Sequence, residues 1–245
     1  MTQTQKDRDA LREWAVFYEA GLRRRNSDVN LTQAQIARER ARLEADPVEW
    51  IKFFFPEYCK FEFADFQTKA IRRCIKNEEW FEVLSWARGL AKSTTVMFIE
   101  MYLTLTGRKC NVMMASATQD SATRLLDPYK KQFEENALIR AYYGVQVNPG
   151  NWCAEEFVAK CGCSFRAVGA GNAPRGSRNG AIRPDVLLVD DFDTDEAVRN
   201  PVNLVRCTEA CGHLANLNIF SDIDIHIGAG VDCRLHQRNC RCGIT

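Results

Sequence analysis

The stretch "VLSWARGLAKSTTVMFIE", Val83 to Glu100, has the pattern of a strand, a tight loop and a helix. Its loop ends in Lys-Ser-Thr, as the phosphate-binding consensus G-x-x-x-x-G-K-[ST] does. That consensus requires two glycines, at positions where this chain has Trp86 and Ala91. The stretch is therefore either a nucleotide site with an altered loop or an ordinary strand–helix turn that contains a lysine.

The loop offers the groups that bind phosphate. Such a site needs backbone N–H groups around the anion, a helix N-terminus and a lysine that reaches the β- and γ-phosphates. Gly89 gives the backbone freedom of φ, and Ala91 is the smallest substitute for glycine. Lys92 stands at the start of the predicted helix, where the Ser93 hydroxyl would face Mg²⁺. The predicted nucleotide-binding residues of the loop are Gly89, Leu90, Ala91, Lys92, Ser93 and Thr94, and Arg88 adds a second cation.

A hydrophobic strand that ends in acids, "DVLLVDD", follows later in the chain. Asp190 at its end would hold Mg²⁺ through water, and Asp191 could polarise an attacking water, a role usually given to glutamate. The alternative is a solvated acidic cluster that caps the next helix, with Asp193 at the cap. Because both halves of a nucleotide site occur in the right order, we predict that Asp190 and Asp191 are functional.

An aromatic residue and a glutamine, Phe66 and Gln67, precede the loop. A glutamine amide can both donate to and accept from the edge of adenine, and an aromatic ring can stack on the base. Glutamines on surface helices are common, so this pair gains meaning only from its place upstream of the loop. In that place, we predict that Phe66 and Gln67 bind the base.

The first 55 residues predict a helical region. Residues 5–24 carry an apolar stripe at helical spacing. Thr32 opens a capping box, and Asp46 with Pro47 repeats the signal for a helix start. The simplest interpretation of residues 1–55 is an N-terminal arm for packing or oligomerisation.

Strands and helices alternate from Phe61 onwards, which predicts an α/β fold with a mainly parallel sheet flanked by helices. Residues 56–206 are predicted to be the core of a P-loop NTPase. Within them, "QDSATRLLDPYKKQFEENALIRAYYG" predicts one long helix that Pro128 can kink. The segment "EEFVAKCGCSFRAVGA" predicts a β-hairpin around Gly162.

The composition of the 245 residues, 46% hydrophobic and 27% charged, is that of a soluble globular protein. No apolar run approaches the roughly 20 residues that a bilayer helix needs. The polar N-terminus does not have the pattern of a signal peptide, so we expect a cytosolic protein without a membrane partner. The net charge of +1 means that any DNA-binding face is local.

From about Asp46 to about Asn203, this set of motifs resembles the large (motor) subunit of tailed-phage DNA-packaging terminases. The motifs that carry the resemblance are "FADFQ", "ARGLAKST", "ASATQDSATRLL", "GAGNAPRGSRNGAIRPD" and "LLVDDFDTDE". Terminase loops often depart from the two-glycine rule and carry an arginine, which Arg88 matches. The resemblance implies an ATPase that uses ATP and Mg²⁺ to move double-stranded viral DNA into a procapsid in the host cytoplasm.

The resemblance also implies roles for single residues and for partners. Gln67 matches the adenine-recognition glutamine, and Asp190 matches the magnesium acid. Arg88, Lys92 and Ser93 match the phosphate loop. Asp191 holds the place of the catalytic carboxylate, where aspartate departs from the usual glutamate. The implied partners are the portal, the small terminase subunit and further copies of the chain in a ring.

Two arginines in the glycine-rich "APRGSRNG", Arg175 and Arg178, are candidates for an arginine finger. Such a finger stabilises charge on the transferred phosphoryl group. The alternative is a loop whose arginines contact solvent or DNA phosphate. The sequence does not choose between these roles, or between the two residues.

The tail, residues 207–245, differs in composition from the rest. It holds all three histidines of the chain together with Cys207, Cys211, Cys233, Cys240 and Cys242. One interpretation is a zinc site, although Cys-x-Cys is too short for one corner of a tetrahedral site. Its possible ligands are Cys207, Cys211, His213, Cys233, His236, Cys240 and Cys242. The interpretation that we favour is a shifted reading frame or a gene fragment. Large terminases normally carry a nuclease domain after the motor, and on this interpretation the motor is truncated and without nuclease activity.

The motor fold also needs a further strand after Asp191. The segment "IDIHIGAG", residues 223–230, alternates as a strand does, but the pattern alone does not decide it. Two other functions therefore stay open. One is a helicase-like P-loop ATPase, which would need a second motor lobe. The other is a non-catalytic remnant that binds nucleotide or nothing.

Overall fold

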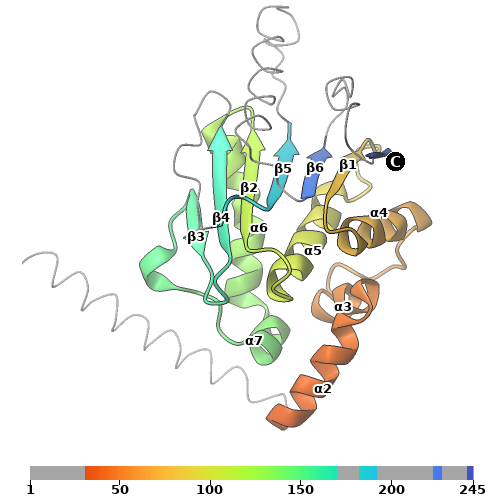
Figure 1. Ribbon diagram of the computed structural model, residues 1–245, viewed down its shortest axis with the longest axis vertical. Coiled ribbons are helices and arrows are strands. Elements are labelled where there is room, and N and C mark those ends of the chain that lie inside the picture. Colours follow the sequence, from red (N-terminus) through yellow and green to blue (C-terminus); the bar gives the residue numbers. More distant parts are fainter. Residues whose placement is uncertain (1–30, 170–181, 192–222, 228–241, 245) are drawn as a thin grey trace, which may run out of the picture.

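The computed structural model describes residues 31–169, 182–191, 223–227 and 242–244 (Figure 1). These residues form a seven-stranded sheet in the order β3-β4-β2-β5-β6-β1-β7. Neighbouring strands are parallel except β3 and β4. The strands are β1 (Trp80–Leu84), β2 (Asn111–Ser116), β3 (Glu156–Val158), β4 (Ser164–Gly169), β5 (Val186–Asp190), β6 (Ile223–Ile227) and β7 (Cys242–Ile244). The predicted α/β class with a mainly parallel sheet is confirmed.

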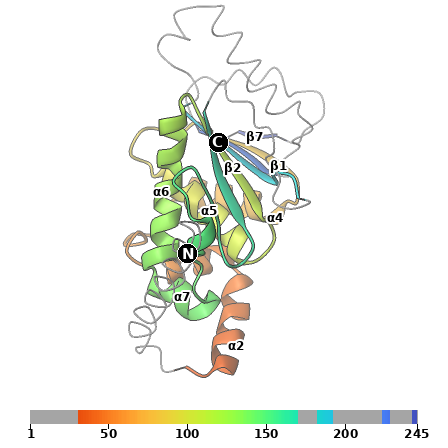
Figure 2. The ribbon, with the colours of Figure 1, turned by 90° about the vertical axis from the view of Figure 1, so that its left-hand side faces the viewer.

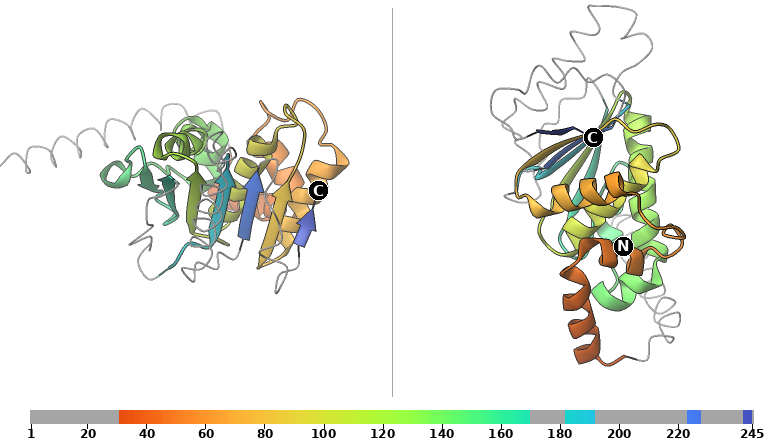
Figure 3. Two further views of the ribbon diagram at one scale, coloured as in Figure 1. Left: turned by 90° about the horizontal axis from the view of Figure 1, so that it is seen from above. Right: turned by 90° about the vertical axis from the view of Figure 1, so that its right-hand side faces the viewer.

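Six α-helices and one 3-10 turn accompany the described strands. They are α2 (Gln33–Glu44), α3 (Pro47–Phe54), α4 (Asp65–Lys76), α5 (Lys92–Leu105), α6 (Gln119–Glu135), α7 (Ala137–Tyr143) and η2 (Pro149–Asn151). Helix α6 packs along β2 and β4 (Figure 2), and α5 lies on the same side of the sheet (Figure 3). None of these helices is both long and apolar enough to cross a bilayer.

The two helix starts predicted in the N-terminal region are confirmed. The Thr32 hydroxyl accepts from the Gln35 backbone N–H at 3.3 Å, and the Gln35 side chain accepts from the Thr32 N–H at 2.8 Å. Asp46 accepts from the Val48 N–H at 2.9 Å, with Pro47 in the first turn of α3. These bonds satisfy N–H groups that have no partner within the helix. The helix predicted over residues 5–24 lies outside the described residues.

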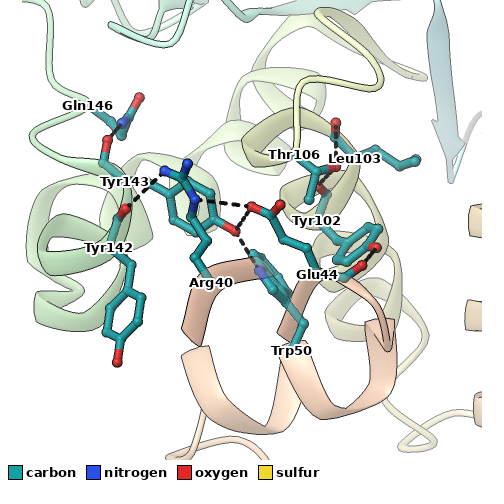
Figure 4. A network of polar contacts seen from close by, with 9 residues as sticks. All are labelled: Arg40, Glu44, Trp50, Tyr102, Leu103, Thr106, Tyr142, Tyr143 and Gln146. Carbon is teal, nitrogen blue, oxygen red and sulfur yellow. Dashed lines mark hydrogen bonds and ion pairs between the residues drawn. The ribbon is translucent and has the colours of Figure 1, made fainter. Parts of the chain in front are cut away.

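Helices α2 and α3 lie at the end of the sheet where the strands begin (Figure 1). Trp50 and Phe54 of α3 are fully buried, and each such side chain contributes about 1.5–3 kcal/mol to folding. Polar contacts add to this packing (Figure 4). The Tyr143 hydroxyl accepts from Trp50 Nε1 and donates to Glu44 Oε1, both at 2.8 Å, and the Tyr102 hydroxyl donates to the Glu44 carbonyl at 2.6 Å. The apolar core therefore continues across residue 55.

The predicted long helix after β2 is two helices, which corrects the sequence-based expectation. Pro128 lies inside α6, and the break is at Asn136 instead. The Asn136 backbone leaves the helical region, with φ −70° and ψ 106°. Its side-chain oxygen accepts from the N–H groups of Leu138 and Ile139, both at 3.0 Å. Asn136 thus ends α6 and caps α7, because asparagine competes well for the backbone donors of a new helix.

The predicted hairpin is confirmed as the antiparallel pair β3 and β4. Gly162 in its turn has a φ of +93°, which favours glycine. Phe157 and Phe165 lie opposite each other, with ring centroids 4.8 Å apart and ring planes 10° from parallel. Both rings are fully buried, so this pair fixes the register of the hairpin.

Residues 223–227 of the segment that the sequence left undecided form a strand. β6 lies between β5 and β1 and is parallel to both. In the register, His226 stands beside Val189 of β5 and beside Val83 of β1. The strand that ends in acids and the strand that leads into the loop are therefore held together by backbone pairing with β6.

Candidate functional site

The candidate site is built on the carboxyl ends of β1 and β5. Loop residues 85–91 connect β1 to α5, and Asp190 ends β5. Both strands are parallel to β6, so these ends meet at one edge of the sheet. In open α/β sheets this edge is where ligands bind.

Backbone conformation at two loop positions explains how the altered loop still turns. Gly89 has a φ of +86°, and Ala91 has φ 56° and ψ 37°, which is the left-handed helical region. The Ala91 carbonyl accepts from the Thr95 N–H at 2.9 Å and from the Thr95 hydroxyl at 2.8 Å. Ala91 therefore takes the conformation for which the consensus uses glycine, at a cost of about 1–2 kcal/mol for an L-residue.

Lys92 is the first residue of α5, and its side chain bends back over the loop. Its Nζ donates to the Trp86 carbonyl at 2.5 Å. Lys92 is half-buried, whereas Arg88 and Ser93 are exposed. The lysine is thus already beside the helix N-terminus, where backbone donors without helical partners also gather.

The Asp190 carboxyl is electrostatically connected to the loop. Burial raises its pKa to about 6, and the neighbouring Asp191 adds to the rise. The Lys92 ammonium and a hydrogen bond from the Ser93 hydroxyl act in the opposite direction and lower that pKa. The structure therefore brings together Lys92, Ser93 and Asp190, three residues that the sequence analysis placed in one site.

Asp191 is exposed and has a φ of 44°, a conformation that aspartate tolerates better than most residues. Its carbonyl accepts from the Ala117 N–H at 3.2 Å and from the Ser116 hydroxyl at 3.4 Å. These bonds anchor the turn after β5 to the end of β2. They orient the backbone of Asp191 and leave its carboxylate at the surface.

Phe66 and Gln67, which precede the loop in the sequence, also contact it. Gln67 Nε2 donates to the Leu90 carbonyl at 3.2 Å, while its Oε1 accepts from the Ala64 N–H at 3.0 Å. The Phe66 ring meets the Trp86 ring edge-on, with centroids 4.8 Å apart. Gln67 and Phe66 thus lie against the loop, and in this structure their contacts are with protein groups; that they bind a base stays a prediction.

Three features near the site were not found from the sequence. The Trp86 carbonyl accepts from Lys92, and the Trp86 indole N–H is buried without a hydrogen-bond partner among the described residues.

The third feature is a buried pair, Glu100 of α5 and Tyr129 of α6, in which the Tyr129 hydroxyl donates to the carboxyl of Glu100. Burial raises the pKa of Glu100 to about 8. Asp190 adds to the rise in the pKa of Tyr129, so this pair lies behind the acid strand. An acid inside the apolar run "MFIEMYL" was the available signal.

Other predicted residues are not described. Arg175 and Arg178 lie outside the described residues, so the arginine-finger hypothesis stays a prediction. The same holds for Cys207, Cys211, His213, Cys233, His236 and Cys240 of the proposed zinc set. Within the described ranges, no group of three or more histidine, cysteine, aspartate or glutamate side chains could hold a metal ion.

Comparison with known proteins finds a similar fold but no similar sequence. Neither a protein-family model nor a curated protein matches the sequence. Among solved structures, the chain is similar to the large terminase of bacteriophage HK97, with a TM-score of 0.50 and 16% sequence identity. The match covers 76% of this chain and 37% of the HK97 chain, so this chain spans well under half of that protein. At this identity the likeness indicates a terminase-like fold.

Proposed function

We propose that this chain is an ATP-hydrolysing motor of viral DNA packaging, equivalent to the ATPase region of a terminase large subunit. The observation that carries the proposal is the convergence of Lys92 and Ser93, at the start of α5 after β1, with Asp190 at the end of β5. The carboxyl of Asp190 responds to both the ammonium and the hydroxyl, although β6 separates the two strands. The terminase-like fold supports the same function.

The residues present fit a magnesium nucleotide. A hydroxyl and a carboxylate are the hard oxygen ligands that Mg²⁺ prefers, and Ser93 and Asp190 supply them. When bound, Mg²⁺ would neutralise charge on the β- and γ-phosphate oxygens. Phosphate would compete with the Trp86 carbonyl for the Lys92 ammonium, because a charged acceptor binds it more strongly than a neutral one. Backbone N–H groups of residues 89–94 would complete the cradle.

The remaining roles complete the mechanism. Asp191 would orient the attacking water for in-line displacement at the γ-phosphate, and Arg88 would neutralise the charge that develops there. Gln67 and Phe66 would contact adenine after exchange of their present contacts with the loop and with Trp86. Arg175 or Arg178 would act on a neighbouring subunit in a ring. Double-stranded DNA, the portal and the small terminase subunit would be the partners, in the host cytoplasm.

The position of β6 helps to decide between an active ATPase and a non-catalytic remnant. A remnant would be expected if the sheet did not continue after Asp191. β6 extends it between the two halves of the site, and β7 pairs with β1 on the other side. A sheet continued in this way favours an active ATPase over a remnant.

The test is ATP turnover by the purified chain with and without double-stranded DNA. Lys92→Ala should lower turnover by about 100-fold or more, because it removes the main cation from the transferred phosphoryl group. The control is Lys76→Ala, which removes an exposed lysine at the end of α4. Turnover that is equal in the two variants would refute the phosphate-loop assignment. Turnover without DNA stimulation would argue against a packaging motor while leaving the ATPase intact.

A further inference from the structure

The hairpin turn between β3 and β4 carries two cysteines on either side of Gly162. We call residues 159–163 the dithiol turn. The turn is closed by hydrogen bonds from the Ala159 N–H to the Cys163 carbonyl at 2.8 Å and from the Gly162 N–H to the Ala159 carbonyl at 2.9 Å. With the φ of +93° at Gly162, these bonds fix the backbone that carries both thiols.

Contacts from outside hold the dithiol turn in place. Gln146, in the segment after α7, accepts from the Lys160 N–H through its carbonyl at 2.8 Å. Its side-chain oxygen accepts from the Cys161 N–H at 3.0 Å, and its side-chain nitrogen donates to the Tyr143 carbonyl at 2.8 Å. A residue that is itself buried thus anchors the turn, so the thiols keep their relative position.

The two thiols differ in environment and stand two residues apart in the turn. Cys161 is exposed and Cys163 is buried, with the Cys163 thiol 3.3 Å from the Thr104 carbonyl. The neighbouring Cys163 thiol is the main cause that lowers the pKa of Cys161, and the Cys163 backbone N–H adds to the effect, while partial burial opposes it. The Cys161 side chain in turn raises the pKa of Cys163 well above its ordinary value, and burial adds to the rise. Negative charge at Cys110 and at Asp185 also raises the pKa of Cys163.

This arrangement is that of an attacking thiol beside a resolving thiol. Thiolate character and exposure determine which cysteine reacts with an oxidant, and a second thiol nearby captures the product. A metal site is the competing interpretation, and it lacks a third ligand in the described part of the chain. The six cysteines between residues 31 and 191 are all thiols, so the pair is in the form that can react.

We propose that the dithiol turn is a peroxide-reactive site at which Cys161 attacks a hydroperoxide and Cys163 closes a disulfide across Gly162. In the first step the Cys161 sulfur takes one oxygen from the hydroperoxide, the O–O bond breaks, and water or an alcohol leaves. The product is a sulfenic acid. In the second step the Cys163 sulfur bonds to the Cys161 sulfur, and the sulfenic oxygen leaves as water with the Cys163 proton. Two thiols are oxidised by two electrons, and the hydroperoxide is reduced.

The site is independent of the proposed ATPase. The dithiol turn precedes β4 and lies where β2 and β4 begin, whereas the loop 85–91 and Asp190 lie at the carboxyl ends of the strands. We therefore expect the disulfide to form in the Lys92→Ala variant as well as in the unaltered chain.

The sequence provides a direct readout by tryptic mass mapping. Cleavage after Lys160 and Arg166 gives the peptide "CGCSFR", which contains both thiols of the turn. Cys153 and Cys110 fall on two other peptides, which end at Lys160 and at Arg124. Cys153 is also exposed, so it is the internal control for a thiol without a resolving partner.

In the first experiment, the folded chain is treated with limiting iodoacetamide at about pH 7. At this pH the rate of alkylation depends on the fraction of each thiol that is ionised. We expect Cys161 to be alkylated at least about tenfold faster than Cys153. In the second experiment, limiting hydrogen peroxide should lower the mass of "CGCSFR" by two hydrogen atoms. The Cys163→Ser variant should stop at a sulfenic acid that dimedone traps at Cys161, and Cys161→Ser should give neither product.

Several results would overturn the proposal. One is equal alkylation of Cys161 and Cys153. Another is a disulfide from Cys161 to Cys110, which would assign the resolving role to a different thiol. A third is oxidation of Cys161 to sulfinic acid in the unaltered chain without any disulfide. The Cys153→Ser variant should leave every expected product unchanged.

Discussion

The Gln119 side-chain oxygen accepts a hydrogen bond from the Gly169 backbone N–H at 2.9 Å, so the end of β4 lies directly on the first turn of α6. The approach is so close that a Cβ on Gly169 would stand 2.4 Å from the Gln119 backbone nitrogen and 2.8 Å from the Thr118 carbonyl carbon. These are backbone atoms, which cannot move aside as the end of a flexible side chain can.

We therefore predict that Gly169→Ala destabilises the protein by about 2 kcal/mol or more, in the range of backbone displacements and overpacking. The measurement is the free energy of unfolding from urea titration. Gly150→Ala is the matched control, because a Cβ there meets its nearest neighbour only at 4.0 Å. If the two variants were equally stable, the close packing of β4 on α6 would be refuted.

The strained alanine of the loop leads to a second prediction. Ala91→Gly should stabilise the protein by up to about 1 kcal/mol, because glycine removes the cost of the left-handed conformation but increases the entropy of the unfolded chain. Ala91→Val should destabilise it, since a β-branched residue tolerates a positive φ least. Thermal unfolding of the three proteins checks the order. A less stable glycine variant would contradict the left-handed conformation at Ala91.

The buried Glu100 predicts how stability depends on pH. Its pKa is about 8 in the folded protein, against an ordinary value of 4.5, because burial opposes the charged form. Between these values the folded state binds one more proton than the unfolded state, so the free energy of unfolding falls as pH rises. The fall should be on the order of a few kcal/mol and should end near pH 8.

The variant Glu100→Gln should abolish the slope above about pH 6, because glutamine keeps the acceptor for Tyr129 and cannot ionise, while Asp190, with its pKa raised to about 6, adds a fall only below that pH. Urea titrations between about pH 5 and 8 measure it. Glu57→Gln, which replaces an exposed glutamate, should keep the slope of the unaltered protein. A slope above about pH 6 that persists in Glu100→Gln would place its origin at another group.

The hydroxyl of Tyr143 predicts how firmly the N-terminal helices are attached. Tyr143→Phe leaves Trp50 Nε1 without its acceptor and Glu44 without its donor, which should cost about 1–3 kcal/mol. The cation–π contact of Arg40 over the ring, at 5.5 Å, should survive the change. In Tyr142→Phe, the control, the lost hydroxyl points away from this network (Figure 4). Limited proteolysis after α3 should be faster in Tyr143→Phe alone.

Local signals were enough to predict most elements of the fold. Thr32, Asp46 and Gly162 each act within a few residues of themselves, so their capping and turn roles can be read from the sequence. Asn136 acts just as locally. The apolar residues continue at helical spacing on both sides of it, so the sequence predicted one helix where α6 and α7 are separate. The order of the strands depends on pairing between distant segments, and no local pattern specifies it.

The candidate site was predicted in its parts and not in its contacts. Lys92, Ser93 and Asp190 were assigned from motif order, and parallel strands explain why they meet at one edge. The bond from Lys92 to the Trp86 carbonyl could not be predicted, because it depends on the bend of the loop in space. The buried Glu100 and Tyr129 come from separate helices, and only tertiary packing brings them together.

The place of β6 in the middle of the sheet has a consequence for the order in which the protein is made. β1 and β5 leave the ribosome before Ile223, so neither has its central neighbour when Asp191 is added. A nascent chain at that stage already contains Gln67, Lys92 and Asp190, but β1, which leads into the loop before Lys92, and β5, which carries Asp190, are not yet joined by pairing. Contacts between distant segments form late in folding. On the proposed function, affinity for nucleotide should therefore arise abruptly once Ile227 has emerged, rather than grow with chain length.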